Sequence, residues 1–335
     1  MASGIKILLI RFSSIGDIVL TSSVIRCINN QSDFEIHALT KIQNKDLFSN
    51  NPRISKVYSF KDSTNEVIQH IRGEGYDYII DLQKNFRSLK LRKKLRIKSY
   101  SFPKVNMEKW LIVNFGINIL PKVHVVDRYF KAVEPLGIKN DNKGLEYYIP
   151  AEDEIIPESI GIHLKDGYIA FVIGGQHTTK ILPPNKVVDI ISKLKLPVVL
   201  VGGPNDFIRG EAIIKMLPDM DVLNLCGKFN LNQSASMIKS SSVVMTNDTG
   251  LMHIAAAFEK PVVSFWGNTI PEFGMYPYLP SNEKLSFISE VKNLSCRPCS
   301  KIGFKKCPKK HFKCMKNQDV SSIIESTNML ITQAK

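Results

Sequence analysis

The sequence has no long hydrophobic run and no dinucleotide-binding glycine motif. No stretch approaches the roughly 18 consecutive apolar residues of a membrane-spanning helix, so we expect no membrane span. The first apolar run, residues 7–10, ends at Arg11 and is too short for a signal peptide, which predicts a cytoplasmic protein. The pattern G-x-G-x-x-G is absent. The one Asp-x-Asp, residues 219–221, follows Pro218 and precedes a predicted strand, which favours a solvated turn over a metal site.

Cysteine is scarce, and four of the six thiols lie in one basic tract near the C-terminus. Cys296 and Cys299 have the spacing of a zinc-binding pair, and His311 lies between the next two, Cys307 and Cys314. The second pair is separated by six residues rather than two, which favours reduced thiols over a structural zinc site but leaves both open. We expect no metal in the functional site.

Length and charge are more informative. A chain of 335 residues is long for one domain and suits two. The net charge of +14 is uneven, because residues 82–107 and 291–318 each contain nine Lys or Arg and no acid. Such segments are either solvated faces or binding sites for an anionic membrane, a phosphorylated substrate or nucleic acid. Nucleic acid is the weakest alternative, because no stacking aromatics alternate with the charges in a known pattern.

Short apolar runs alternate with helical patterns along the whole chain. The first half has predicted strands at residues 5–10, 34–38, 57–60 and 78–81, with helices at 17–28 and 66–72. The second half has predicted strands at residues 168–173, 198–201, 222–225, 243–246 and 262–265. Alternation of this kind predicts an α/β protein with two Rossmann-like domains and parallel sheets. The acidic, proline-bounded stretch 149–154 is the expected linker between domains 1–150 and 151–335.

Ligands of open α/β sheets bind beyond the carboxyl ends of the strands, so polar loops at those ends are candidate sites. The loop after the first strand, Arg11-Phe-Ser-Ser-Ile-Gly-Asp17, delivers one carboxylate, and Ser14 and Gly16 leave room for a ligand. The alternative is that Asp17 only caps the next helix.

Three further loops of this kind lie in the second half. Residues 174–180 combine glycines, hydroxyls and Lys180, which suits a phosphate, although a polar turn would look the same. Residues 202–206 add a carboxylate. In residues 243–258 a strand runs through Asp248 into a helix whose free N–H groups favour an anion. His253 is either a donor to a ligand or a core residue, and a lone His beside an Ala-rich helix is more often the latter. Three of the four candidate loops lie in the second half of the chain and one lies in the first. This distribution predicts a nucleotide donor in the C-terminal domain, facing a carboxylate across a cleft.

The chain resembles glycosyltransferase family 9, the lipopolysaccharide heptosyltransferases, over nearly its whole length. The resemblance rests on six stretches in the family's order: ILLIRFSSIGDIVLTSSVIR, IIDLQKNFRS, TTKILP, LVGGPND, NLCGKFNL and TNDTGLMHIAAAFEKPVVSFWGNT. It implies the GT-B fold, with two Rossmann-like domains facing a central cleft, and metal-independent inverting transfer of heptose from ADP-heptose to the inner core of lipopolysaccharide. Another nucleotide sugar or acceptor, or a sugar-nucleotide epimerase, is the alternative.

The same resemblance implies roles for individual residues. Asp17 would be the general base and Lys180 a second catalytic group. The implied donor-binding residues are Ser14, Gly16, Thr178, Thr179, Lys180, Asp206, Asp248, Thr249, Gly250, Leu251, Met252 and His253. The implied acceptor-binding residues are Asn85, Arg87 and Lys90. Asp206 stands where many members have Glu, and Leu251 where many have Pro.

The implied partners are a nucleotide-sugar donor, an anionic glycolipid acceptor and the inner membrane surface, which the protein would contact peripherally. Neither a cofactor nor nucleic acid is expected. The C-terminal domain would carry a basic, Cys-rich tail, and its last helix is free to pack back on the N-terminal domain.

Overall fold

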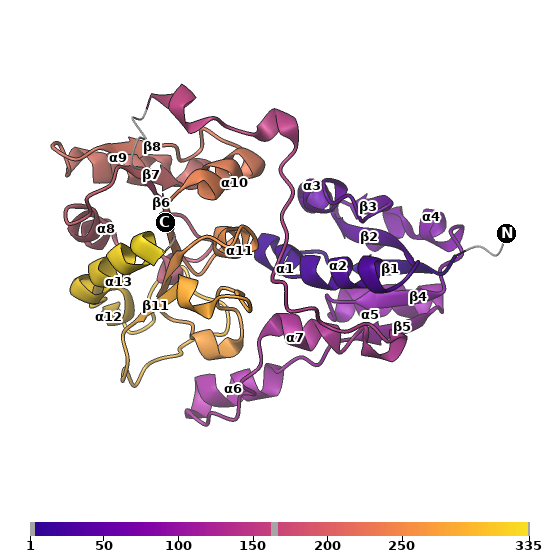
Figure 1. Ribbon diagram of the computed structural model, residues 1–335. Helices are drawn as coiled ribbons and strands as arrows, with labels where there is room; N and C mark the ends of the chain where they lie inside the picture. Colours follow the sequence, from indigo (N-terminus) through magenta and orange to yellow (C-terminus); the bar gives the residue numbers. More distant parts are fainter. Residues whose placement is uncertain (1–3, 162–166, 334–335) are drawn as a thin grey trace. The chain divides into compact units, whose positions relative to one another are not determined.

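The computed structural model describes residues 4–161 and 167–333, which form two compact units (Figure 1). The first unit comprises Met1–Val105 and Val123–Tyr148, and the second comprises Asn106–Lys122 and Ile149–Lys335. Each unit is built around its own parallel sheet. The expected division at residue 150 lies close to the observed one, but residues 106–122 depart from the expected order and belong to the second unit.

The sheet of the first unit has five parallel strands in the order β3-β2-β1-β4-β5. Their bounds are β1 Lys6–Ile10, β2 Glu35–Lys41, β3 Lys56–Phe60, β4 Tyr78–Asp81 and β5 Lys98–Ser101. The helices are α1 Ile15–Val19, α2 Ser22–Gln31, α3 Lys45–Ser49, α4 Ile68–Arg72, α5 Phe86–Leu95 and α7 Val125–Phe130, with 3-10 turns η1 Ile42–Asn44, η2 Thr64–Glu66 and η3 Glu134–Leu136. The central strand β1 is apolar and buried, as expected of a strand covered on both faces.

The sheet of the second unit has six parallel strands in the order β11-β10-β9-β6-β7-β8. Their bounds are β6 Ile169–Val172, β7 Val198–Val201, β8 Val222–Asn224, β9 Val243–Asn247, β10 Val262–Trp266 and β11 Ser286–Glu290. The helices are α6 Asn106–Phe115, α8 Pro184–Ile191, α9 Phe207–Lys215, α10 Leu231–Ser240, α11 Gly250–Ala257, α12 Lys313–Lys316 and α13 Val320–Gln333. The 3-10 turns are η4 Ala151–Asp153, η5 Pro157–Ile160, η6 Thr178–Lys180, η7 Pro204–Asp206, η8 Pro271–Phe273 and η9 Glu283–Leu285.

Side chains on the two faces of this second sheet form separate cores. Phe171 of β6 belongs to a core that includes residues of α8, α9 and α13, whereas its neighbour Ala170 belongs to one that includes α10 and α11. Successive residues of a strand point to opposite faces, so each face buries its own helices. The last helix, α13, packs against α8, β9, β10 and β11 within the second unit.

Both sheets confirm the predicted two-domain α/β architecture, and each has one point where the strand order reverses. In the first sheet this switch lies between β1 and β4, and in the second between β6 and β9. Loops that leave such a pair diverge to opposite faces and open a crevice for a ligand. The polar loops after β1, β4, β6 and β9 therefore occupy the positions at which α/β proteins bind ligands.

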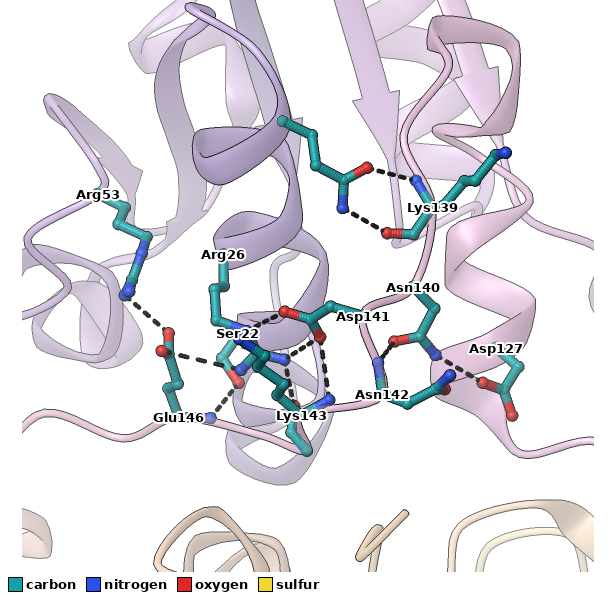
Figure 2. Close-up of polar contacts among 12 residues, drawn as sticks. Ser22, Arg26, Arg53, Asp127, Lys139, Asn140, Asp141, Asn142, Lys143 and Glu146 are labelled. Carbon is teal, nitrogen blue, oxygen red and sulfur yellow. Dashed lines mark hydrogen bonds and ion pairs between the residues drawn. The ribbon is translucent and has the colours of Figure 1, made fainter. Parts of the chain in front are cut away.

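An ion-pair network fixes the last stretch of the first unit against α2 (Figure 2). Arg26 donates from Nε and Nη2 to the two carboxylate oxygens of Asp141, over 2.9 and 2.7 Å. Glu146 accepts from Nη1 of Arg53 at 2.7 Å, and its backbone N–H donates to Oγ of Ser22 at 2.9 Å. Arg26 is buried, so this two-point contact is a strong link between α2 and the segment that leads to the second unit.

Candidate functional site

The carboxylate of Asp17 lies just beyond the carboxyl end of β1, in the first turn of α1. Its Oδ2 accepts from the backbone N–H and the hydroxyl of Ser14, at 3.1 and 2.9 Å. Its Oδ1 lies 2.5 Å from Nη2 of Arg11 and accepts from the hydroxyl of Tyr129 at 3.4 Å. Asp17 therefore does help to cap the helix, but it also belongs to a larger polar cluster that a cap alone would not need.

Arg11 gives this cluster its electrostatics. The guanidinium is buried, and it donates to the backbone carbonyls of Ser13, at 2.8 Å, and Leu82. Burial alone would lower the pKa of Arg11, but Asp17, Tyr129 and Asp81 together outweigh that effect and raise the pKa above its ordinary value. Burial also raises the pKa of the Tyr129 phenol. The phenol therefore stays protonated and the guanidinium stays charged beside Asp17 at neutral pH.

The loop after β4 is organised by a fully buried carboxylate. Asp81 accepts from the backbone N–H of Lys84 at 2.7 Å and from the hydroxyl of Ser88 at 2.8 Å, and it lies 3.1 Å from Nε of Arg92. Asn85 caps the following helix α5 by accepting from the backbone N–H of Ser88 at 2.9 Å. Part of the basic helix is thus structural, because Arg92 compensates the charge of Asp81.

An open hollow of about 440 Å³ lies between the β1, β2 and β4 loops of the first unit. We call it the Lys41 hollow, and its lining consists of Phe12, Ser13, Lys41, Asn85, Phe86 and Arg87. It contains two of the three expected acceptor residues, Asn85 and Arg87, whereas Lys90 does not line it. Lys41 was missed in the sequence, although its place as the last residue of β2 puts it at the carboxyl edge of the sheet.

In the second unit the loops after β6 and β9 are joined by an ion pair. Nζ of Lys180 lies 2.5 Å from Oδ2 of Asp248, and the hydroxyl of Thr269 donates to the same oxygen at 2.9 Å. Asn247, the last residue of β9, donates to the carbonyl of Gly174 at 3.0 Å. These contacts place the cation of one loop beside the helix start of the other.

The two threonines of this region differ in availability. Thr178 is exposed, whereas Thr179 is buried. The Thr179 hydroxyl donates to the carbonyl of Phe304 at 3.1 Å and accepts from its N–H at 2.8 Å. Thr179 therefore ties the loop after β6 to the C-terminal tail, and Thr178 is the hydroxyl that faces solvent.

The side chain of Asp206 lies against Gly174, in the loop after β6. A Cβ built on Gly174 would lie 2.3 Å from Oδ2 of Asp206, so the close approach requires glycine there. That oxygen accepts from the N–H of Gly203 at 3.0 Å, and Oδ1 accepts from Arg209 at 2.8 Å. The carboxylate expected near the donor thus reaches the loop that holds Lys180.

Helix α11 presents its first turn at the end of β9. Thr249 is its N-cap and Gly250 its first residue, and both are half-buried. Leu251 is also half-buried, whereas the side chains of Met252 and His253 are buried. Any ligand at this helix start would therefore meet the free backbone N–H groups of Gly250, Leu251 and Met252 rather than the buried side chains of Met252 and His253.

A sequence model of a protein family matches most of the chain. The model described as glycosyltransferase family 9 (heptosyltransferase) matches residues 64–310. The chain belongs to glycosyltransferase family 9. It is 24% identical over 292 residues to lipopolysaccharide heptosyltransferase 1 of Campylobacter coli, a match that covers 79% of this chain and 84% of that protein.

Solved structures of family 9 proteins share the fold of this glycosyltransferase. Escherichia coli ADP-heptose lipopolysaccharide heptosyltransferase II superposes with a TM-score of 0.72 at 19% identity, covering 98% of this chain and 99% of that one. The family 9 protein of Veillonella parvula DSM 2008 superposes with a TM-score of 0.76 at 21% identity, covering 98% and 97%. The predicted GT-B class is thus confirmed, and the glycosyltransferase is an enzyme of the heptosyltransferase type.

The Cys-rich tail of the glycosyltransferase forms a small enclosed cluster. Cys296, Cys299, Cys307 and Cys314 line one cavity of about 10 Å³, where Sγ of Cys296 lies 3.7 Å from Nε2 of His311. Burial raises the pKa of Cys299, and that of Cys314 to about 11, so both thiols are protonated at neutral pH. Within residues 4–161 and 167–333, no three ligand-type side chains are arranged to hold a metal ion.

No helix among the described residues of the glycosyltransferase is long and apolar enough to cross a membrane.

Proposed function

We propose that this glycosyltransferase transfers heptose from ADP-heptose to the inner core of lipopolysaccharide, with inversion and with Asp17 as the general base. The observation that carries the proposal is the Asp17 carboxylate, held at the carboxyl end of β1 by Ser14 and Arg11. An oriented carboxylate at the switch point of a sheet is suited to receive a proton from a bound hydroxyl.

The proposed chemistry needs a base because a sugar hydroxyl is too weakly acidic to attack unaided. Its oxygen would form the new bond to the anomeric carbon while the bond from that carbon to the diphosphate breaks on the opposite face. The hydroxyl proton would pass to Asp17 during the attack. Ser14 holds Oδ2 of Asp17 through its backbone N–H and its hydroxyl. The carboxylate would therefore keep its orientation when Oδ1 exchanges Arg11 for the acceptor hydroxyl.

The leaving diphosphate would be stabilised by the second unit. Lys180 supplies a positive charge, and Thr249 and Gly250 start a helix whose N–H groups point to the same side of the sheet. We propose that Asp248 holds Lys180 in position before the donor arrives and that the diphosphate then shares this cation. Asp206, beside Gly174, would accept hydrogen bonds from the ribose hydroxyls. No step requires a metal ion.

The anionic glycolipid acceptor would bind on the first unit. Lys41 and Arg87 contribute two cations to the Lys41 hollow, and Asn85 contributes an amide. A phosphate or carboxylate group of the acceptor fits this lining by charge. Lys90, exposed on α5 outside the hollow, would then act at longer range.

The proposed acceptor is a membrane lipid, so the enzyme would work on the cytoplasmic side and contact the inner membrane peripherally. The two basic segments, residues 82–107 and 291–318, are suited to that contact because anionic lipids attract clustered Lys and Arg.

A nucleotide-sugar panel tests the function. In a thermal-shift screen of ADP-, UDP- and GDP-sugars, ADP-heptose should raise the melting temperature most, because a ligand of the folded state stabilises it. ADP should be released only after a lipopolysaccharide inner-core acceptor is added. Release with a different sugar nucleotide would change the donor assignment. Conversion of the donor without any acceptor would indicate an epimerase and contradict the proposal.

A further inference from the structure

The segment of residues 106–122 presents an unusual number of apolar side chains to solvent. Helix α6 packs one face on the second unit, where Ile112 contacts Ile270 and Phe273. The exposed apolar residues beyond that face define what we call the α6 surface, which consists of Met107, Trp110, Phe115, Ile117 and Ile119. Ile112 is the one residue of the helix that is buried, so most of its apolar side chains lie outside this contact.

Aromatic rings lie at the centre of the α6 surface. The rings of Trp110 and Phe115 meet edge-on with centroids 5.2 Å apart, and the two residues are 47% and 62% exposed. Single exposed apolar residues are ordinary on a protein, whereas a cluster of large ones marks an interaction site. Trp and Phe prefer the boundary between lipid headgroups and acyl chains, so the composition suits a membrane surface.

One lysine of the C-terminal tail contacts the start of α6, and two more follow it in the same loop. Lys301 donates from Nζ to the backbone carbonyl of Asn106 at 3.2 Å, which attaches the C-terminal tail to the start of α6. The next tail residue, Ile302, is 63% exposed, and it is followed closely by the exposed Lys305 and Lys306. Exposed apolar side chains beside a loop that carries several lysines are complementary to an anionic bilayer.

We propose that the α6 surface, together with the tail loop from Lys301 to Lys306, docks this glycosyltransferase on an anionic lipid bilayer. The inference deepens the membrane contact of the proposed function and rests on it. A second copy of the chain is a poorer occupant, because a self-complementary contact would bring the lysines of both copies together. The ten-residue α6 inserts at the interface and does not span, as no described helix is long and apolar enough to do so.

Tryptophan fluorescence offers a direct test. The chain has two tryptophans, and Trp266 is buried at 1% exposure, so a change on lipid binding reports on Trp110. Full-length enzyme should show a blue-shifted emission with vesicles of phosphatidylglycerol and phosphatidylcholine, and brominated acyl chains should quench it. Pure phosphatidylcholine vesicles should give a much smaller change. High salt should weaken the binding, because lysines contribute to it.

Variants distinguish binding by the α6 surface from non-specific hydrophobic binding. Trp110→Ser should reduce co-sedimentation with the anionic vesicles by about tenfold. The matched control is Ile208→Ser on α9, which replaces an 82% exposed apolar residue outside the α6 surface and should bind as the wild type does. Lys305→Glu with Lys306→Glu should remove the preference for anionic lipid.

Three results would overturn the docking proposal: no emission shift with anionic vesicles, equal losses in Trp110→Ser and Ile208→Ser, or a concentration-dependent dimer that Trp110→Ser abolishes. Transfer to a delipidated, water-soluble acceptor without vesicles tests the proposed function separately. Trp110→Ser should keep the wild-type rate in that assay. A failure of docking and a failure of catalysis therefore give different results.

Discussion

Arg11 and Asp17 form an ion pair across the loop after β1, with Nη2 of the arginine 2.5 Å from Oδ1 of the aspartate. The arginine side chain is only 8% exposed, so the pair lies where water screens it weakly. The arginine fixes the direction of the carboxylate and occupies one of its two oxygens. A bound acceptor hydroxyl would have to compete with Arg11 for Oδ1 or approach another lone pair.

Asp17→Asn tests the general base. The amide keeps the shape of the side chain but cannot take a proton, so kcat should fall by about 10²- to 10⁴-fold while donor affinity is kept. Because the amide leaves Arg11 without its opposite charge, we also expect the free energy of unfolding to fall by about 1–3 kcal/mol. Steady-state kinetics with donor and acceptor varied separately, together with thermal melting, would measure both effects.

Ser14→Ala is the matched control for that experiment. It removes the hydroxyl that donates to Oδ2 of Asp17 at 2.9 Å but leaves the carboxylate and the backbone donor in place. Its loss in kcat should stay within about tenfold. Wild-type turnover in a folded, donor-binding Asp17→Asn protein would reduce Asp17 to a helix cap.

The ion pair between Lys180 and Asp248 leads to a prediction about the donor. Lys180→Ala should raise the donor KM and lower kcat, because charge on the leaving diphosphate grows in the transition state. Lys180→Arg should rescue only part of the loss, since its flat guanidinium differs from a point charge.

A double-mutant cycle distinguishes a binding cation from a structural one. If Lys180 only neutralises Asp248, then Lys180→Ala and Asp248→Asn should each destabilise the fold, and the pair together should cost little more than one alone. If Lys180 contacts the diphosphate, Asp248→Asn should retain most of the donor affinity that Lys180→Ala loses. Unchanged donor kinetics in Lys180→Ala would contradict the proposed role.

The lining of the Lys41 hollow predicts a split between the two substrates. Lys41→Ala combined with Arg87→Ala should raise the acceptor KM by at least about tenfold and leave the donor KM near the wild-type value. Lys90→Ala removes an equal type of charge outside the hollow and serves as the control, with a smaller effect expected. Arg92 is unsuitable for such a test because it pairs with the buried Asp81. Equal changes in both KM values would argue against an acceptor site.

Buried strands were predictable because short, continuous apolar runs are typical of strands that helices cover on both faces. The runs that form β1, β4 and β9 are mostly apolar and buried, and their positions agree with prediction. The edge strands β5 and β11 were missed, because their sequences, KSYS and SFISE, are half polar and mostly half-buried. The opposite edge strands, β3 and β8, were predicted, so it is the polar composition of β5 and β11 rather than edge position alone that hides them.

The helix expected at residues 17–28 shows a second limit. The chain forms two helices instead, α1 and α2, with Leu20 and Thr21 between them. The Thr21 hydroxyl donates to the carbonyl of Ile18 at 2.7 Å, a local contact that competes with a continuous helix. The apolar periodicity continues across residues 20–21, so the periodicity does not show that the helix is interrupted there.

Loops at the strand ends were found in advance, but the partners of their side chains were not. Thr179 and Phe304 are joined by hydrogen bonds across a separation of 125 residues, and Asp17 and Tyr129 across 112. Lys41 joins Arg87 at one hollow through strand pairing and loop packing. These long-range contacts depend on tertiary structure, which the spacing of motifs along the chain does not predict.

The last prediction concerns acid stability and rests on the contact between Arg26 and Asp141 (Figure 2). Hydrogen bonds from Arg26 lower the pKa of Asp141 from 3.8 to about 2. The unfolded chain therefore takes up this proton at a higher pH than the folded one, so the pair's stabilisation is complete above about pH 5 and is lost as the pH falls toward 2. Asp141→Asn should cost about 2 kcal/mol at neutral pH, and its deficit in melting temperature should shrink steadily below pH 4. The control Asp62→Asn replaces an exposed carboxylate and should differ little from the wild type at any pH. A deficit for Asp141→Asn that stays constant from pH 7 to pH 2 would show that the pair does not couple folding to protonation.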